Sequence, residues 1–115
     1  MSLLLAVLLA QPLPLAIRTP GERAFMKCYS CHSATPGEHG LPGPNLACLF
    51  GRKAGSLPGF DYSPALGGAD FTWDKARLNQ FLQNPDSLAP GTSMTPPRLT
   101  PDERATIIAY LAGEL

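Results

Sequence analysis

Cys28, Cys31 and His32 form the part of this chain whose chemistry is most evident. Two thiols three positions apart on a helix lie about one turn apart, so both can reach the vinyl groups of one haem and form thioether bonds. The imidazole that follows would then be held at the iron as an axial ligand. This spacing is the attachment signal of a c-type haem. The sequence therefore predicts one covalently bound, iron-containing haem c.

The same pair of cysteines also permits two other interpretations. Two thiols at this spacing occur in zinc sites and in thioredoxin-like redox centres. Zinc needs four donors, and only His32, His39 and Cys48 remain to complete a set, none of them in a second paired motif. A thioredoxin-like pair needs a βαβ context, and no strand-like alternation surrounds the motif. We favour haem attachment and keep zinc and redox chemistry as alternatives.

A second candidate ligand is Met94. The sixth coordination position of a haem iron decides between electron transfer and ligand chemistry. Met94 lies in the polar, proline-rich segment Pro90–Pro97, where no apolar periodicity supports a role in the core. Filling a gap in the core is the usual role of methionine and remains the alternative. Met1 and Met26 are weaker candidates, because one is the first residue and the other falls within the first expected helix.

Several segments, in a fixed order along the chain, resemble class I cytochromes c of the mitochondrial and α-proteobacterial kind. The resemblance extends from about residue 20 to residue 115 and rests on Cys28–His32, Gly43–Leu46, Phe50–Gly55, Gly59–Leu66, Trp73, Asn84–Pro85 and Pro90–Met94. It implies a small all-α class I cytochrome c fold, with three main helices and long loops wrapped around one covalent haem. We therefore expect a cytochrome c domain over residues 19–115.

The resemblance also assigns residues around the haem. The carbonyl of Pro44 would accept the outer N–H of the His32 imidazole, a contact that raises the basicity of a ligand and fixes its orientation. Four other positions match hydrogen-bond donors of the family, the first three near the haem propionates and the last near the methionine sulfur: Arg52, Tyr62, Trp73 and Thr92. Pro44 could equally shape a turn, and Trp73 could serve core packing alone.

The chain departs from the family pattern at several positions. Cys48 is the thiol left over after haem attachment. We expect it to be a buried small hydrophobe, and the alternative is an exposed thiol able to dimerise the protein. Phe81 stands where a tyrosine often donates toward the methionine sulfur, and Leu66 replaces an asparagine. The methionine side of the haem should therefore be drier. His39 lies in a polar loop and should be solvated.

Helix caps and apolar periodicity predict three helices. Thr19-Pro20-Gly21-Glu22 has the spacing of a capping box and predicts a helix that runs to about Cys28 or beyond. A second helix should span about Trp73 to Gln83 and end before Asn84-Pro85, with Leu78, Phe81 and Leu82 turned inward. Thr100-Pro101-Asp102-Glu103 repeats the capping box and should open a last helix to about Ala112, with the apolar stripe Ile107, Ile108, Leu111 and Leu115.

The first and last of these helices should cross closely at Gly21, which has no side chain. The family resemblance implies the same crossing and places Phe25 and Tyr110 at the contact.

Residues 1–18 differ from the rest of the chain. The apolar run Leu3–Ala10 is followed by Gln11–Ile17, which contains two prolines. The two segments together are too short, and too interrupted by proline, to be a good membrane-spanning helix. We interpret them as a signal peptide. An uncleaved N-terminal anchor is the alternative, because no basic residue precedes the run and neither Ala10 nor Ala16 closes an A-x-A site. Haem attachment normally follows export in bacteria, so a periplasmic or otherwise exported location is expected.

Composition bounds the remaining possibilities. A chain of 115 residues is one small domain with a limited core. Its 13 prolines and 11 glycines indicate short helices joined by long, structured loops. Nine basic and nine acidic residues give no net charge, which leaves nucleic-acid binding without electrostatic support. The lysines are only Lys27, Lys53 and Lys75, and Ser93 stands where a lysine often precedes the methionine. Docking should therefore depend more on apolar contact than on long-range steering.

With His32 and Met94 both on the iron, no position remains open for oxygen or peroxide, so no enzyme activity is predicted. We expect a monomeric one-electron carrier between redox partner proteins, such as membrane reductase and oxidase-type complexes or dehydrogenases of a respiratory or photosynthetic chain. Membrane association is expected only if the N-terminus stays uncleaved. The redox potential of the carrier should be high within the roughly 0.8 V range that axial ligands span. The alternatives are a fixed haem subunit of a larger oxidoreductase and a haem sensor or peroxidase-like protein with a displaceable Met94.

Overall fold

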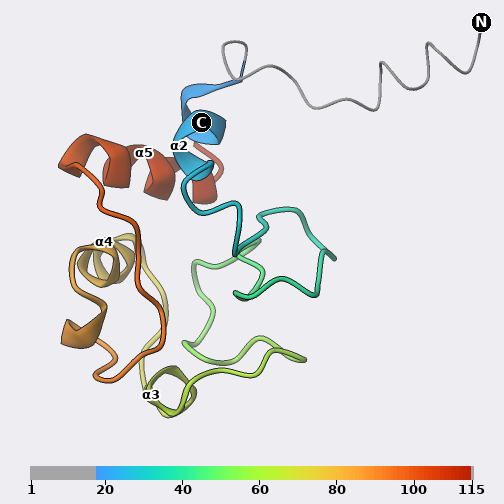
Figure 1. The fold of residues 1–115 in the computed structure, drawn as a ribbon, viewed down its shortest axis with the longest axis vertical. Helices are drawn as coiled ribbons and strands as arrows, with labels where there is room; N and C mark the ends of the chain where they lie inside the picture. The colour runs from blue at the N-terminus through green and yellow to red at the C-terminus, as the bar shows by residue number, and fades with distance from the viewer. Residues whose placement is uncertain (1–17, 115) are drawn as a thin grey trace, which may run out of the picture.

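The computed structural model describes residues 18–114, and all its regular elements are helical (Figure 1). In chain order they are α2 (Pro20–Phe25), α3 (Pro64–Gly67), α4 (Lys75–Gln83), the 3₁₀ helix η2 (Pro85–Ser87) and α5 (Pro101–Leu111). No strand occurs in this part of the chain, where Lys53 and Thr72 form only an isolated antiparallel bridge. The all-α prediction is confirmed. The interpretation of residues 1–18 falls almost entirely outside the described residues, as does Leu115 of the last helix.

Both predicted capping boxes are present. At the start of α2, the Thr19 hydroxyl accepts the Glu22 backbone N–H at 3.2 Å, and the Glu22 carboxylate accepts the Thr19 N–H at 3.3 Å. Thr100 and Glu103 make the same reciprocal pair at the start of α5, at 3.2 and 3.0 Å. Because these contacts satisfy N–H groups that no helical carbonyl can reach, they fix where each helix begins.

Helix α2 ends at Phe25, earlier than the predicted Cys28. The N–H groups of Lys27 and Cys28 donate to carbonyls three residues back, those of Ala24 and Phe25, instead of four. The chain then turns again, because the His32 N–H donates to the Cys28 carbonyl at 3.0 Å. The prediction was too long because these tight turns replace the last helical turn. They also place the two attachment cysteines in consecutive turns.

Helices α2 and α5 cross at Gly21, as predicted. A Cβ atom built on Gly21 would lie 2.8 Å from Cδ1 of Tyr110, which leaves no room for a side chain at this position. The rings of Phe25 and Tyr110 pack with their centroids 5.3 Å apart, and Ile107 joins Phe25 in the buried cluster between the two helices. Figure 1 shows the two helices together at one end of the molecule. This packing anchors the segment that carries the attachment cysteines.

Helix α4 supplies the apolar wall on the other side. Asp74 caps it by accepting the Arg77 N–H at 2.7 Å, so the helix begins two residues after the predicted Trp73. Its inward face consists of Leu78, Phe81 and Leu82, all buried as predicted. Trp73 packs edge-on against the Phe81 ring with centroids 5.3 Å apart. None of the helices in residues 18–114 is long and apolar enough to cross a membrane.

Candidate haem site

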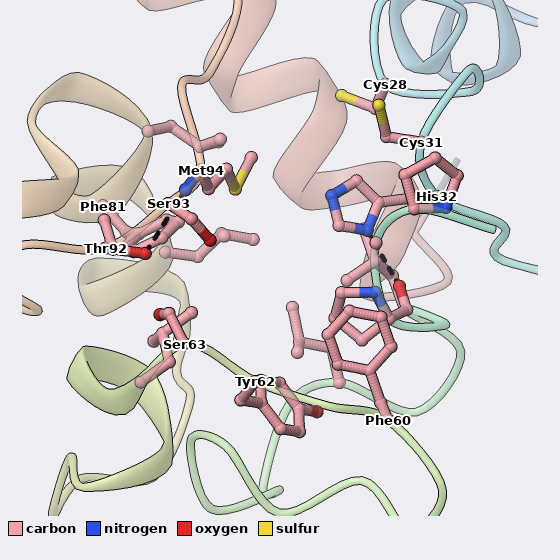
Figure 2. Close-up of a pocket in the computed structure, with 18 of the residues that line it drawn as sticks. Cys28, Cys31, His32, Phe60, Tyr62, Ser63, Phe81, Thr92, Ser93 and Met94 are labelled. Atoms are coloured by element: carbon pink, nitrogen blue, oxygen red, sulfur yellow. Dashed lines mark hydrogen bonds between the residues drawn. The ribbon is translucent and has the colours of Figure 1, made fainter.

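A cavity of about 520 Å³ lies between α4, the attachment turns and the loops, within the usual size range of small-molecule sites. All the predicted site residues line it: Cys28, Cys31, His32, Pro44, Arg52, Tyr62, Trp73, Thr92 and Met94. Residues far apart in sequence thus meet around one space, and Figure 2 shows several of their side chains surrounding it. The structure brings the candidate set together without leaving any member outside.

His32 is buried, and its Nδ1 lies 2.8 Å from the carbonyl oxygen of Pro44. A carbonyl only accepts, so Nδ1 must carry the hydrogen, and in the neutral ring Nε2 keeps its lone pair. Burial lowers the pKa of His32, and the hydrogen bond to Pro44 opposes this shift in part. The imidazole is therefore held neutral with one nitrogen available to a metal. The contact with Pro44 is the one that the resemblance implied.

Gly43 lies directly against the His32 ring and was missed by the sequence reasoning. A Cβ atom built on Gly43 would lie 2.3 Å from Cε1 of His32 and 2.6 Å from its Nδ1. The Gly43 N–H also donates to the Cys31 carbonyl at 2.7 Å, which ties this loop to the attachment turns. Glycine is required here for space. In the sequence, Gly43-Pro44 predicts a turn but does not indicate that Gly43 contacts the His32 ring.

The two attachment thiols are free and lie at the same edge of the cavity, Cys28 buried and Cys31 exposed (Figure 2). Burial raises the pKa of the Cys28 thiol, and the neighbouring Cys31 raises it further. Thioredoxin-like cysteines react as thiolates with lowered pKa values. The shift at Cys28 has the opposite direction and does not favour the redox-pair interpretation.

Met94 lies across the cavity from His32. In Figure 2 its thioether and the imidazole face the same open space from opposite sides. Met94 is half-buried and packs partly against the main apolar cluster, which includes Phe81 and Leu82. The Thr92 hydroxyl accepts the Met94 backbone N–H at 3.5 Å, a long hydrogen bond that shapes the turn. The arrangement offers one nitrogen and one sulfur donor to a metal placed between them.

Arg52, Tyr62 and Trp73 form a polar and aromatic edge of the cavity. The Arg52 guanidinium donates to the Asn45 carbonyl at 2.9 Å, which leaves other donors of its fork unused by this contact. The Tyr62 hydroxyl accepts the Leu57 N–H at 3.2 Å and retains its own hydrogen as a donor. Trp73 is buried and packs edge-on against Phe71, with centroids 5.0 Å apart. Donors therefore remain for a negatively charged group inside the cavity.

Ser63 is a further lining residue that the sequence reasoning did not single out. Its hydroxyl is buried without any hydrogen-bond partner, although it occupies the N-cap position of α3. Buried polar atoms without partners are rare and costly. A carboxylate within the cavity would satisfy this hydroxyl, and the haem propionates are such groups. In the sequence, a serine before a proline suggests a helix cap and does not indicate a hydroxyl that could bind a carboxylate in the cavity.

The donor set and the orphaned hydroxyl both fit a haem c. Two thiols stand at one edge, a neutral imidazole and a thioether face each other, apolar side chains cover much of the wall, and polar donors collect near Tyr62 and Ser63. A zinc site finds no support in residues 18–114, where no group of three or more His, Cys, Asp and Glu side chains could hold a metal ion.

Cys48 does not behave as expected. The prediction of a buried small hydrophobe is wrong, because Cys48 is exposed. Its backbone adopts a left-handed turn with φ 57°, and the buried position is taken by the next residue, Leu49. His39 is exposed, as predicted for a solvated side chain.

Comparison with known proteins adds independent evidence. The family model for cytochrome c matches residues 19–113. Among similar proteins is cytochrome c2 of Rhodomicrobium vannielii, 43% identical over 95 residues that cover 82% of this chain and 76% of the relative. Cytochrome c of Sesamum indicum is 44% identical over 93 residues, or 79% of this chain and 84% of the relative.

Cytochrome c of Chlamydomonas reinhardtii is 45% identical over 93 residues, which cover 79% of this chain and 83% of the relative. The family match thus spans the stretch that carries the cavity and all its predicted lining residues. The chain therefore belongs to the cytochrome c family, as an electron carrier with covalently bound haem c and not as an enzyme.

Proposed function

We propose that residues 19–115 form a monohaem domain in which Cys28 and Cys31 carry the thioether bonds and His32 and Met94 are the axial ligands. The observation that carries this assignment is the position of the four side chains around one cavity, with the imidazole and the thioether on opposite sides. When bound, haem c supplies a one-electron Fe(II)/Fe(III) couple.

The protein's own contribution begins with orientation. The Pro44 carbonyl holds the Nδ1 hydrogen of His32 and so directs Nε2 toward the cavity. Gly43 packs against the ring and limits its rotation. The segment that follows η2 presents Met94 from the other side, half-buried against the apolar cluster. His32 and Met94 would then both hold the iron, which would leave no vacant site for a diatomic ligand.

The apolar wall sets the direction of the redox potential. Phe81 is 3% exposed and Leu82 is 8% exposed, and with Leu78 and Leu66 they line the cavity. A water-excluding wall disfavours the extra positive charge of the ferric state, and a thioether ligand has the same effect. We therefore infer a high potential within the range of c-type haems.

The polar edge serves the propionates. The cavity wall holds hydrogen-bond donors that would stabilise carboxylates taken out of water: Arg52, Tyr62, Trp73 and Ser63. Thr92 shapes the turn before Met94, because its hydroxyl accepts the Met94 backbone N–H. These roles follow the chemistry of each side chain and its place in the wall.

The protein works between redox partner proteins. We infer that residues 1–18 act as an export signal, because thioether attachment in bacteria takes place after export, and that the mature protein is a periplasmic or similarly exported carrier. Reductase and oxidase-type membrane complexes or dehydrogenases are the proposed partners. The mass of the mature N-terminus distinguishes a cleaved carrier from an anchored haem subunit.

Covalent attachment is tested with cysteine variants. The holoprotein should keep its haem in acid-acetone and in denaturing gels, because thioether bonds survive both treatments. Cys28→Ala and Cys31→Ala should each lower haem incorporation, and the double variant should abolish covalent haem. Cys48→Ala is the matched control and should behave as the wild type, since Cys48 does not line the cavity. Haem that extracts freely from the wild type would overturn the proposal.

Carbon monoxide separates a carrier from a haem sensor. The ferrous holoprotein should not bind carbon monoxide at neutral pH, because Met94 fills the sixth position, whereas ferrous Met94→Ala should bind it. Binding by the wild type at a concentration that saturates the variant would favour the sensor or peroxidase-like alternative.

A further inference from the structure

All three lysines of the chain are paired with carboxylates in the structure. Lys27 pairs with Glu103, Lys75 pairs with Glu114, and Lys53 lies 3.9 Å from Asp70. Such surface pairs add little to stability, but each one cancels a positive charge that a partner could otherwise sense. The lysines therefore offer little long-range attraction to an acidic surface.

The pair of Lys27 and Glu103 matters most, because Lys27 lines the cavity. The ammonium of Lys27 donates to the Glu103 carboxylate, and this hydrogen bond is the main cause that lowers the pKa of Glu103. Glu103 is thus charged at neutral pH, and the pair of Lys27 and Glu103 carries no net charge. The exposed residues that line the cavity are Lys27, Ser30, Cys31, Pro42, Asp61, Ser93 and Thr95. Asp61 is the only other charged side chain among them.

Each large apolar side chain exposed in residues 18–114 is the sequence neighbour of an exposed residue that lines the cavity. These side chains are Met26 at 39%, Tyr29 at 60% and Leu41 at 38% exposure. Scattered exposed hydrophobic residues are ordinary, but Met26 and Tyr29 lie in the attachment turns and Leu41 lies two residues before Gly43. The Gly43 N–H bonds to the Cys31 carbonyl and joins these segments. We call the surface formed by Tyr29, Ser30, Leu41 and Pro42 the docking face.

We propose that the redox partner of this protein presents an uncharged, partly apolar surface to the docking face, and not a cluster of carboxylates. The inference rests on the proposed function and specifies its partner. Charge complementarity selects this occupant, because Lys27 and Asp61 are the only charged side chains among the exposed residues that line the cavity, and Lys27 is paired. The step that follows docking moves one electron to an oxidised one-electron centre of the partner and transfers no proton or group.

Gold electrodes coated with defined monolayers supply both partner chemistries. The holoprotein should adsorb and exchange electrons on a mixed methyl- and hydroxyl-terminated monolayer, and at least about tenfold less protein should be electroactive on a carboxylate-terminated one. Leu41→Lys should raise the signal on carboxylate, and Tyr29→Ser should reduce it on the methyl-containing surface. Both variants should keep the wild-type haem spectrum, which controls for folding. A wild-type preference for the carboxylate monolayer would overturn the proposal.

Two substitutions that change the net charge equally test whether Glu103 cancels the positive charge of Lys27. Glu103→Gln should free Lys27 while its amide preserves the capping box, because Gln also serves at that position. Glu114→Gln makes the same change in net charge at a pair that does not line the cavity. The probe is oxidation of the ferrous protein by hexacyanoferrate(III), a small anion.

The wild-type rate should change by less than about twofold between roughly 0.01 M and 1 M ionic strength, where the Debye length falls from about 30 Å to about 3 Å. Glu103→Gln should react severalfold faster at low salt and slow as salt is added, more than Glu114→Gln. A steep fall for the wild type, or identical behaviour of the two variants, would contradict the cancellation of Lys27.

Failure of this inference is distinct from failure of the proposed function. A protein that shows a reversible one-electron couple with soluble mediators, yet prefers the carboxylate surface, retains the proposed function and refutes the uncharged partner. A protein without covalent haem or a reversible couple refutes both.

Discussion

At the scale of single residues, the site depends on how one imidazole is held. The Nδ1–H group of His32 donates to the Pro44 carbonyl oxygen, which lies 2.8 Å from Nδ1, and Gly43 packs against the ring. The side chain therefore has few alternative orientations. Its partner across the cavity, Met94, comes from a proline-rich segment that is half-buried against α4 and its neighbours. In the proposed site, the Pro44 carbonyl and Gly43 would therefore fix the orientation of the His32 ligand.

Gly43→Ala tests this arrangement. The added methyl would lie 2.3 Å from Cε1 of His32, so the ring or the loop must move. We expect a loss of about 1–3 kcal/mol in the free energy of unfolding and a changed haem spectrum in the ferric state. Denaturant titration of the holoprotein measures the first and absorbance the second.

Gly67→Ala is the matched control. Its new methyl would approach nothing closer than the Tyr62 Cβ at 3.9 Å, and Gly67 is the last residue of α3. The substitution should leave stability unchanged or raise it by about 0.5–1 kcal/mol. Equal effects of the two substitutions would show that Gly43 does not constrain the imidazole.

Residue-level prediction worked where chemistry is local and less well where it depends on packing. The attachment cysteines and His32 are adjacent, and Met94 lies in a distinctive segment, so their meeting at one cavity could be anticipated. The buried, unpartnered hydroxyl of Ser63 and the exposure of Cys48 could not be predicted from the sequence. Whether a serine hydroxyl is orphaned, or a cysteine exposed, depends on neighbours that are distant in sequence.

At the scale of elements, the crossing of α2 and α5 holds the attachment turns in place. Gly21 permits close approach to Tyr110, and Phe25 packs beneath it with Ile107. Both helices begin with a Thr-Pro capping box, a local signal that needs no tertiary partner. Their starts were therefore predicted correctly.

The ends and the short elements were harder to predict. Helix α2 stops at Phe25 because tight turns follow it, and nothing in its periodicity marks that change. Helix α3 has four residues, Pro64–Gly67, and η2 has three, Pro85–Ser87, so neither is long enough to show an apolar repeat. Such segments take their form from the loops that they join.

Gly21→Ala tests the crossing. Alanine is favoured over glycine in a helix by about 1 kcal/mol, but its methyl would lie 2.8 Å from Cδ1 and 2.9 Å from Cβ of Tyr110. We expect a net loss of stability, since overpacking costs about 1–3 kcal/mol. Thermal unfolding of the holoprotein measures it.

A double-mutant cycle assigns the cause. In a Tyr110→Ala background the ring is gone and the helices can adjust, so Gly21→Ala should cost at least about 0.5 kcal/mol less than in the wild type. Additive effects would mean that the clash with Tyr110 is not the reason for glycine at this position.

At the scale of the whole molecule, the cavity interrupts the core. The main buried cluster includes Leu49, Trp73 and Phe81, and each of these also lines the cavity. Without the haem these side chains would face a large void, and a chain of this size has little other apolar surface to bury. Folding and haem binding should therefore be strongly linked.

Removal of the haem tests this linkage. Cleavage of the thioether bonds should leave a polypeptide that has lost most of its helical circular dichroism. Fluorescence of Trp73, the only tryptophan, should rise severalfold, because the residue lines the cavity and the haem quenches it. A haem-free chain with native helix content would show that the fold stands without its cofactor.

The most direct test of the central claim, ligation of the iron by His32 and Met94, is the weak near-infrared charge-transfer band that sulfur ligation gives to ferric haem. The wild type should show this band, and Met94→Ala should lose it. Met26→Ala should keep it, because Met26 is exposed and does not line the cavity. A band that survives Met94→Ala, or that disappears in Met26→Ala, would contradict the assignment of Met94 as the sixth ligand.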